Sequence, residues 1–478
     1  MEILRLFVIG FSYFILVYAV ASFMIELVQI ITAIFLSYRE ERRVRAVQSE
    51  VGQKAPELVP ISIIAPAHNE SAVVLDSLQS FLNLRYPVYE VVLVNDGSTD
   101  DTLEKVIKEY GLQKSVFPVR KQVPCAKIRG VYHNPEFPNL VVVDKESAGN
   151  KADASNAGIN VSSYPYFVAL DVDCLLDEDS LIWISRGFMA NQRVKAIGGM
   201  IRLSNGNTIL DGRVVGKLQL PKNWLARFQI VEYFRSFLVG RMFWSKINAL
   251  LIISGAFGAF EKETVIEVGG YTLKTAGEDM DLVVKIHRHM TKSKKKYKIV
   301  FSPQAVCWTQ APENLQNFNR QRRRWGVGNM QVIRRYKEIL WNPKYGTKGL
   351  IAMPYYLLYE YLGGAVLLLG ILVTPLNIYF GLLTVRQIFL LMIVAILLGI
   401  ITSLGALIAN TKLAFRDYSF HDFMILIGCC ILENFIYRPY NFLIRIQVLF
   451  RYKKYLHVWD SISRQSFDEM SVEQSSEE

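Results

Sequence analysis

Two apolar regions near the ends of the chain constrain its fold most strongly. Residues 4–36 are almost wholly apolar, and residues 349–450 contain three further apolar stretches, near Ile351–Val373, Ile388–Ala409 and Phe420–Phe442. About 20 helical residues cross the hydrocarbon core of a bilayer, so each stretch is long enough to span it. The sequence therefore predicts an N-terminal membrane helix at residues 1–38 and a group of membrane helices at residues 349–450.

Positive charge is concentrated beside these apolar regions. The net charge of +11 comes largely from Arg39–Arg45, Arg320–Lys348 and Arg451–Lys454. This placement indicates orientation in a lipid bilayer and no nucleic-acid partner. One conflict remains, because one span before the middle of the chain and three after it place the C-terminus outside, whereas the basic residues at Arg451–Lys454 indicate the inside. A re-entrant segment or an extra N-terminal pass would resolve it.

The membrane regions flank segments of different character. Residues 39–59 are predicted to form a basic linker, residues 60–312 the globular domain, residues 313–348 interfacial helices, and residues 451–478 a cytosolic or disordered tail. The aromatic and basic stretch Trp224–Asn248 indicates either an interfacial helix or an ordinary surface helix. Five cysteines without metal-ligand spacing or a disulfide pattern indicate a reducing cytosol.

The globular domain alternates short apolar runs with amphipathic stretches. The apolar runs, which are typical of buried parallel strands, are Ile61–Ala65, Val91–Val94, Leu140–Val143 and Phe167–Leu170. Helices are predicted between them, near Ala72–Leu82, Thr99–Tyr110 and Ala152–Val161. This alternation predicts an α/β fold with a Rossmann-like, mostly parallel sheet.

Polar residues follow the predicted strands where each one ends. They lie in the segments His68–Glu70, Asn95–Ser98 and Asp171–Asp173. Ligands of open α/β sheets bind at the carboxyl ends of the strands, so these segments are expected to meet at one site.

Asp171 and Asp173 form the pair of carboxylates in this set. Residues i and i+2 of an extended chain point to the same side, so both can face one cation. Hard oxygen ligands suit Mg²⁺ or Mn²⁺, and Mg²⁺ commonly combines carboxylates with substrate phosphates. Lys151 opens a predicted helix after Gly149-Asn150 and adds a cation where a phosphate would bind. The alternative for Lys151 is a solvated surface lysine.

A second acidic pair, Glu278-Asp279, begins another predicted helix after Gly277. Carboxylates in a first helical turn can simply complement the helix dipole. Alternatively, a carboxylate that faces a nucleotide-sugar site can act as a general base and deprotonate an acceptor hydroxyl. The sequence leaves both interpretations open.

The stretch Gln321–Trp325 combines three arginines with one tryptophan, shortly before the C-terminal apolar region. Successive helical side chains are about 100° apart, so at least one arginine is expected to face inward while another meets solvent or lipid headgroups. An inward guanidinium suits phosphate oxygens, and the tryptophan offers a flat face to a sugar ring. The alternative is a basic patch bound to anionic lipid.

These motifs occur together in the order seen in processive family 2 glycosyltransferases. The set comprises His68-Asn69-Glu70, Asn95–Ser98, Gly149–Asn156, Asp171-Val172-Asp173, Gly277-Glu278-Asp279 and Gln321–Trp325. From about Pro60 to Trp341, the chain resembles the membrane-embedded cellulose, chitin, hyaluronan and poly-N-acetylglucosamine synthases. The resemblance implies a GT-A-like fold for the cytosolic domain. Two positions depart from the family pattern, since His68 replaces a common aromatic residue and Gly277 a frequent threonine.

The resemblance also implies roles for the donor-side residues. Asp96 and the segment that contains Pro66, His68 and Glu70 would hold the uridine. Lys151 and Asp171 would contact the diphosphate region of the nucleotide. Asp173 would bind the Mg²⁺ or Mn²⁺ ion that bridges the diphosphate.

On the acceptor side, the resemblance makes Asp279 the catalytic base, with Glu278 supporting it. Gln321 and Arg324 would reach the diphosphate and the acceptor site. Trp325 would carry the terminal sugar of the growing chain. In-line attack on an α-linked UDP-sugar would then give a β-linked product.

The predicted function is a processive inverting glycosyltransferase that polymerises a β-linked polysaccharide from UDP-glucose or UDP-N-acetylglucosamine and moves it across the membrane. The alternative enzyme is a non-processive transferase with a lipid acceptor, and a non-catalytic scaffold or transporter is a third class. The expected location is the plasma membrane, with several spans and a cytosolic catalytic domain. The expected partners are the UDP-sugar, the growing polysaccharide, the lipid bilayer, and either accessory export subunits or further copies of the chain.

Overall fold

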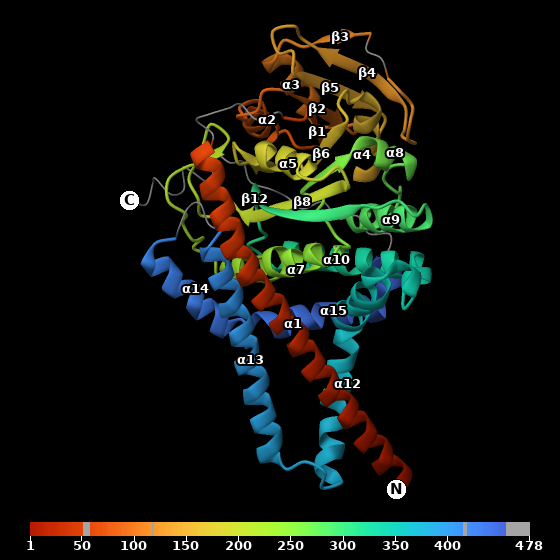
Figure 1. The fold of residues 1–478 in the computed structure, drawn as a ribbon, viewed down its shortest axis with the longest axis vertical. Helices are drawn as coiled ribbons and strands as arrows, with labels where there is room; N and C mark the ends of the chain where they lie inside the picture. Colours follow the sequence, from red (N-terminus) through yellow and green to blue (C-terminus); the bar gives the residue numbers. More distant parts are fainter. Residues whose placement is uncertain (51–57, 117–118, 414–417, 456–478) are drawn as a thin grey trace.

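The computed structural model describes residues 1–50, 58–116, 119–413 and 418–455. The sheet-containing domain occupies one end of the long axis, and helices α1 (Glu2–Glu50), α12 (Gly363–Tyr379) and α13 (Val385–Thr411) extend from it toward the other end (Figure 1). The N-terminus and the α12–α13 connection both lie at the end remote from the sheet. The apolar regions at the two ends of the sequence therefore come together in space.

The domain is built on a ten-stranded mixed sheet in the order β3-β4-β5-β2-β1-β6-β11-β8-β12-β7. Its parallel part consists of β5 (Leu140–Lys145), β2 (Tyr89–Asn95), β1 (Ile61–Ala67) and β6 (Tyr166–Leu170). Each contains one of the predicted apolar runs, so the predicted strands and the α/β class are confirmed. The interior residues of these strands are buried on both faces, as expected for a parallel sheet covered by helices.

The other half of the sheet is mainly antiparallel. β11 (Phe257–Glu261) runs antiparallel to both β6 and β8 (Val194–Leu203), and β12 (Lys298–Thr309) pairs in parallel with β8. β7 (Cys174–Leu176) ends this half and runs antiparallel to β12. At the opposite edge of the sheet, β4 (Ile128–His133) runs antiparallel to both β5 and β3 (Gln113–Ser115).

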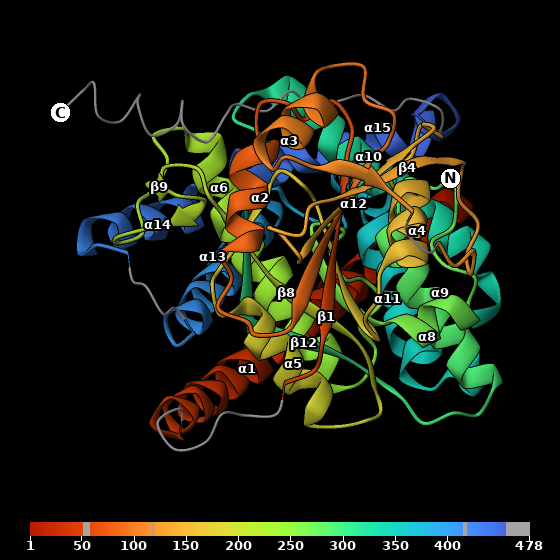
Figure 2. The same ribbon diagram turned by 90° about the horizontal axis from the view of Figure 1, so that it is seen from above.

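Helices cover both faces of the sheet (Figure 2). On one face, Leu78 and Phe81 of α2 (Val74–Leu82) belong to the hydrophobic cluster that contains Ile61 and Ile63 of β1. On the other, α4 (Lys151–Val161) approaches β1 so closely that a Cβ atom on Gly158 would lie 2.3 Å from Ile64. This contact holds the N-terminus of α4, and so Lys151, beside the strand ends. Further helices of the domain are α3 (Thr102–Glu109), α5 (Ser180–Met189), α8 (Lys262–Glu267) and α9 (Glu278–Lys292).

A layer of helices separates the sheet from the apolar helices. α6 (Trp224–Tyr233), a π-helical segment (Phe234–Gly240) and α7 (Arg241–Lys246) form one continuous run, and α10 (Leu315–Arg335) lies in the same layer (Figure 1). The run packs against α1, α13 and α14. Residues 224–248 are therefore not an ordinary surface helix, and their position at a membrane interface stays a prediction. We call this run the interfacial run and, together with α10, the interfacial layer.

The predicted boundary at residue 38 differs from the structure, because α1 continues to Glu50. A hydrogen bond of 2.9 Å from Gln304 Nε2 to Glu40 Oε2 attaches this extension to β12. Residues 51–57 of the predicted linker and residues 456–478 of the predicted tail lie outside the described residues.

The third predicted C-terminal span, Phe420–Phe442, is not one straight helix. α14 (Phe420–Leu432) and α15 (Tyr437–Tyr455) meet at a bend of 51°, and both run across the direction of α13 in Figure 1. The bend lies at Glu433, whose buried carboxylate pairs with Arg235 at 2.6 Å and Arg438 at 3.1 Å. These ion pairs fix the break against the interfacial layer.

Membrane spans can be counted in more than one way within the described residues. Glu2–Val44 and Val385–Thr411 are each long and apolar enough to cross a bilayer. Two bent pairs raise the total to four if each pair is one span: Lys348–Tyr361 with Gly363–Tyr379, and α14 with α15.

Candidate active site

The polar segments at the strand ends line one cavity. Its wall includes the predicted donor-side residues Pro66, His68, Glu70, Asp96, Lys151, Asp171 and Asp173, and the predicted acceptor-side residues Glu278, Asp279, Gln321, Arg324 and Trp325. Every site residue predicted from the sequence is therefore found at one place. The cavity has a volume of about 1870 Å³ and also extends between the apolar helices.

Asp96 is anchored by a lysine that the sequence interpretation missed. The Lys145 side chain is fully buried and forms ion pairs with Asp96 and, at 2.7 Å, with Asp153 of α4. The backbone carbonyl of Asp96 lies 2.9 Å from His68 Nδ1. Lys145 ends β5 just as Asp96 follows β2, so its position at a strand end was a usable signal. Two carboxylates offset the charge of this buried ammonium group and hold Asp96 in place.

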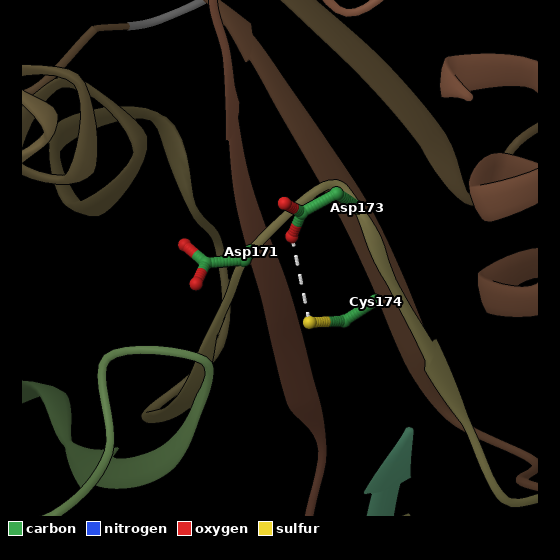
Figure 3. A group of neighbouring side chains, drawn as sticks. All are labelled: Asp171, Asp173 and Cys174. Atoms are coloured by element: carbon green, nitrogen blue, oxygen red, sulfur yellow. Dashed lines mark hydrogen bonds between the residues drawn. The ribbon is translucent and has the colours of Figure 1, made fainter. Parts of the chain in front are cut away.

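The carboxylates of Asp171 and Asp173 lie at the turn between β6 and β7 (Figure 3). One carboxylate oxygen of Asp171, one of Asp173 and the sulfur of Cys174 all lie within 4.8 Å of one another. Asp173 is buried, and one of its oxygens lies 3.6 Å from the Cys174 sulfur. Two adjacent carboxylates make this turn suitable for a hard divalent cation.

Lys151 is the first residue of α4 and reaches the same turn. Its ammonium group pairs with Asp171 and donates a hydrogen bond of 2.7 Å to the Gly255 carbonyl. The Asn150 side chain caps the helix by accepting a hydrogen bond from the Asp153 N–H. With 21% of its side chain exposed, Lys151 is not the solvated surface lysine of the alternative interpretation.

Glu278 and Asp279 form the first turn of α9 and face Lys151 across the cavity. Asp279 accepts hydrogen bonds from the N–H of Gly255 at 3.0 Å and from the N–H of Met280 at 2.7 Å. Burial, and then the charge of Asp279, raise the pKa of Glu278 to about 7. Glu278 and Asp279 can therefore complement the dipole of α9 and also line the cavity.

The three arginines of the α10 motif have different environments. Arg322 is buried and pairs with Glu232, and it also donates to the Tyr437 hydroxyl at 3.1 Å, so it joins α10 to α6 and α15. Arg323 donates to Gln447 at 3.1 Å, outside the cavity. Arg324 lines the cavity, and its positive charge partly offsets the rise in the pKa of Glu278. The expected division between inward and outward arginines is present, and the lipid-patch alternative accounts for neither Arg322 nor Arg324.

Trp325 borders the cavity with 37% of its surface exposed. The Arg322 guanidinium lies 4.3 Å from its ring centroid, and Phe237 of the interfacial run lies 6.2 Å away. These contacts hold the indole at the cavity wall while it stays partly exposed. Gln321, on the preceding turn of the same helix face, has a buried side-chain oxygen without a hydrogen-bond partner among the described residues.

The helices that carry the two acceptor-side motifs meet at a pair of glycines. A Cβ atom on Gly277 would lie 2.9 Å from the Cα atom of Gly328, and one on Gly328 would lie 2.8 Å from Gly277. The departure from threonine at Gly277 therefore has a packing reason. It lets the start of α9, which carries Asp279, approach α10, which carries Trp325, directly.

We expect Gly277→Ala to destabilise the protein by about 1–3 kcal/mol, because the added methyl overpacks this contact. Thermal unfolding in detergent measures the change. Gly428→Ala on α14 is the matched control, since a Cβ atom there would have no neighbour within 4 Å and helix propensity favours alanine. Equal stability of both variants would show that the α9–α10 contact can relax.

Comparison with known proteins identifies the family. The model for glycosyltransferase like family 2 matches residues 56–328, which is more than half of the chain. The chain belongs to this family. A second model, for chitin synthase, matches residues 271–445 and covers both acceptor-side motifs and the helices that follow.

Similar proteins of this glycosyltransferase family include poly-beta-1,6-N-acetyl-D-glucosamine synthases. One from Staphylococcus epidermidis is 30% identical over 322 residues, which are 67% of this chain and 66% of the relative. One from Staphylococcus aureus strain COL is 30% identical over 281 residues, or 58% of this chain and 57% of the relative. The aligned part thus spans about three fifths to two thirds of the length of these relatives.

Among solved structures, the glycosyltransferase resembles a mannosyltransferase from Pyrobaculum calidifontis that was determined with GDP-Man and Mn²⁺. The TM-score is 0.51 at 16% identity, and the match covers 89% of this chain and 99% of the other. At this identity the similarity supports the fold alone, and it agrees with the predicted GT-A-like arrangement.

Proposed function

We propose that this glycosyltransferase is a processive, inverting polysaccharide synthase that uses a UDP-sugar and passes its product through the membrane. The observation that carries the proposal is the single cavity that joins the strand-end carboxylates, Trp325 and the apolar helices. The names of the similar synthases favour UDP-N-acetylglucosamine over UDP-glucose as the donor.

On the donor side, Asp96 would bind the uracil-ribose part, supported by Lys145 and the loop that contains His68. Lys151 and Arg324 would neutralise the diphosphate, since both cations face the cavity. Lys151 pairs with Asp171, so a bound diphosphate would share the ammonium group with this carboxylate.

A divalent metal ion fits the turn at Asp171–Asp173, where both carboxylates are close together. We propose Asp173 as its principal ligand, with the Lys151-paired carboxylate of Asp171 beside it. When bound, the ion would neutralise charge on the leaving diphosphate.

Asp173→Asn should weaken activation by Mg²⁺ or Mn²⁺, because one anionic ligand is lost. The measurement is a metal titration of sugar transfer by the purified parent and variant. Asp101→Asn, at an exposed position outside the cavity, is the matched control. An unchanged titration, together with full activity of the parent in chelator, would make the Asp171–Asp173 turn structural.

In the transfer step, the acceptor hydroxyl oxygen would attack the anomeric carbon while the bond to the diphosphate breaks and UDP leaves. Asp279 would take the hydroxyl proton. The hydrogen bonds from the N–H groups of Gly255 and Met280 hold this carboxylate in place. Attack opposite the leaving group inverts the anomeric centre and produces a β linkage.

Beyond Trp325 the cavity continues between α1, α12 and α13, where Tyr18, Tyr359, Leu367 and Met392 line it. This path would receive the polymer as it grows. We place α12 and α13 across the membrane with α1, and α14 and α15 at the interface on the side of the catalytic domain. Two spans would then follow the domain, and Arg451–Lys454 would lie on its cytosolic side, which removes the conflict in the charge pattern.

The test is synthesis by the purified chain in detergent with radiolabelled UDP-N-acetylglucosamine, UDP-glucose or UDP-glucuronate and Mn²⁺. The expected product is a long β-linked polymer of N-acetylglucosamine. The apolar part of the cavity wall would also suit a lipid acceptor, and a single sugar on a lipid would establish that alternative. No transfer from any of the three donors would contradict the proposal.

A further inference from the structure

The first residue of α7, Arg241, is a buried cation that feels the charge of Asp279 but lies within ion-pair distance of no carboxylate among the described residues. Only 5% of its surface is exposed, and its Nη1 atom has no hydrogen-bond partner among the described residues. Burial lowers the pKa of its guanidinium to about 10, so the group stays charged at neutral pH. A buried charge that lacks a partner is strongly unfavourable, so its retention requires an explanation.

Neighbouring arginines show how unusual this is. Four of the other arginines that line the same cavity are paired with carboxylates: Arg322 with Glu232, Arg235 and Arg438 with Glu433, and Arg445 with Glu360. Arg241 forms no ion pair with any carboxylate in the described part of the chain. Its contact is with the Phe237 ring, whose centroid lies 4.0 Å from the guanidinium carbon.

Arg241 lies on the acceptor side of the site. Phe237, over which it packs, is the neighbour of Trp325 at 6.2 Å between ring centroids. Arg241, Trp325 and Asp279 all line the cavity. The guanidinium therefore presents N–H donors next to the proposed platform for the terminal sugar.

A complementary group lies on α10. Asn329 follows Trp325 by four residues and so lies on the same helix face. It lines the cavity, and its side-chain oxygen is buried without a hydrogen-bond partner among the described residues. The walls near Trp325 thus offer an unused donor on α7 and an unused acceptor on α10.

We infer that Arg241 and Asn329 form an acceptor subsite that selects an N-acetylated sugar unit. An acetamido group carries a carbonyl oxygen and an N–H, which match the guanidinium donors and the Asn329 oxygen. A free amino sugar lacks the carbonyl and bears a positive charge that Arg241 repels. A uronate carboxylate would satisfy Arg241 but offers no donor to Asn329. This inference rests on the proposed polymerase function and adds a basis for its acceptor specificity.

The experiment compares two acceptors under saturating radiolabelled UDP-N-acetylglucosamine. One is a short β-1,6-linked N-acetylglucosamine oligomer, and the other is the same oligomer after de-N-acetylation. We expect the parent to prefer the acetylated acceptor by at least about tenfold in kcat/KM, mainly through KM, because the alternative leaves buried polar groups unpaired. Arg241→Gln and Asn329→Ala should each remove most of this preference and leave the KM for the donor unchanged.

Arg227→Gln is the matched control. Arg227 belongs to the same interfacial run and packs over an aromatic ring, with 4.8 Å between its guanidinium carbon and the Trp224 centroid, but it does not line the cavity. This variant should keep the parental preference, whereas a general loosening of the interfacial layer would affect all three variants alike.

The outcomes separate the two proposals. If the parent makes no polymer and extends neither oligomer, the polymerase function fails, and the subsite fails with it. If the parent makes polymer but extends both oligomers equally, or if both cavity variants keep the preference, the subsite alone is wrong. Should Arg241→Gln not fold, the Asn329→Ala result decides.

Discussion

Asp279→Asn is expected to reduce sugar transfer by roughly 10²- to 10⁴-fold, the range that general acid–base groups contribute, with little effect on UDP binding. The N–H groups of Gly255 and Met280 donate to different oxygens of the carboxylate, so an amide can keep only one of these hydrogen bonds, and it cannot accept the hydroxyl proton. The measurements are initial rates of polymer synthesis and UDP affinity in detergent.

The neighbouring Asp281 provides a structural comparison for this variant. It is fully buried on α9 and pairs with Arg335 and Thr272, away from the cavity wall. Asp281→Asn should therefore lower the thermal stability of the protein more than it lowers the rate of sugar transfer. Synthesis by Asp279→Asn at close to the parental rate would refute the assignment of the base.

Trp325→Ala is expected to retain UDP binding and to make little or no polymer. The indole covers the apolar face of a sugar ring and excludes water from it, so its loss affects the acceptor more than the donor. Polymer length and yield in detergent, together with UDP affinity, measure the effect. Trp224→Ala is the matched control, because Trp224 is a 51% exposed tryptophan of the interfacial run that does not line the cavity.

Arg324→Ala should give a different pattern from Trp325→Ala. Its guanidinium faces the cavity near Glu278 and would neutralise diphosphate charge that grows as the sugar departs. We therefore expect weaker donor binding together with slower turnover. Full polymer length and yield from Trp325→Ala in detergent, where anionic lipid is absent, would refute the platform role and revive the lipid-patch interpretation.

The parts of the fold set by local pattern were predictable from the sequence. The apolar runs that became β1, β2, β5 and β6 have both faces buried, so each appears as continuous hydrophobic sequence. The motifs at their ends, from His68 to Asp173, converge because parallel strands bring their carboxyl ends to one edge. Cytosolic placement and the roles of these residues stay predictions.

Features that depend on contacts between distant segments could not be predicted in this way. The bend at Glu433 depends on Arg235, almost 200 residues earlier, and hydropathy alone favours a straight span at Phe420–Phe442. The approach of Gly277 to Gly328 and the pairing of Lys145 with Asp96 are also tertiary. Arg241 and Asn329 have no motif of their own, and each is distinguished only by a buried side-chain atom without a hydrogen-bond partner among the described residues.

We propose that one cavity connects the donor site to a path through the membrane. Its most direct test uses the purified chain in sealed liposomes, with the catalytic domain outward and radiolabelled UDP-N-acetylglucosamine added outside. A glycosidase specific for the polymer is then added with and without detergent. We expect most of the polymer to lie inside the vesicles and to be digested only after detergent is added. Polymer that is fully digested in intact vesicles, or a product of a single sugar on lipid, would contradict it.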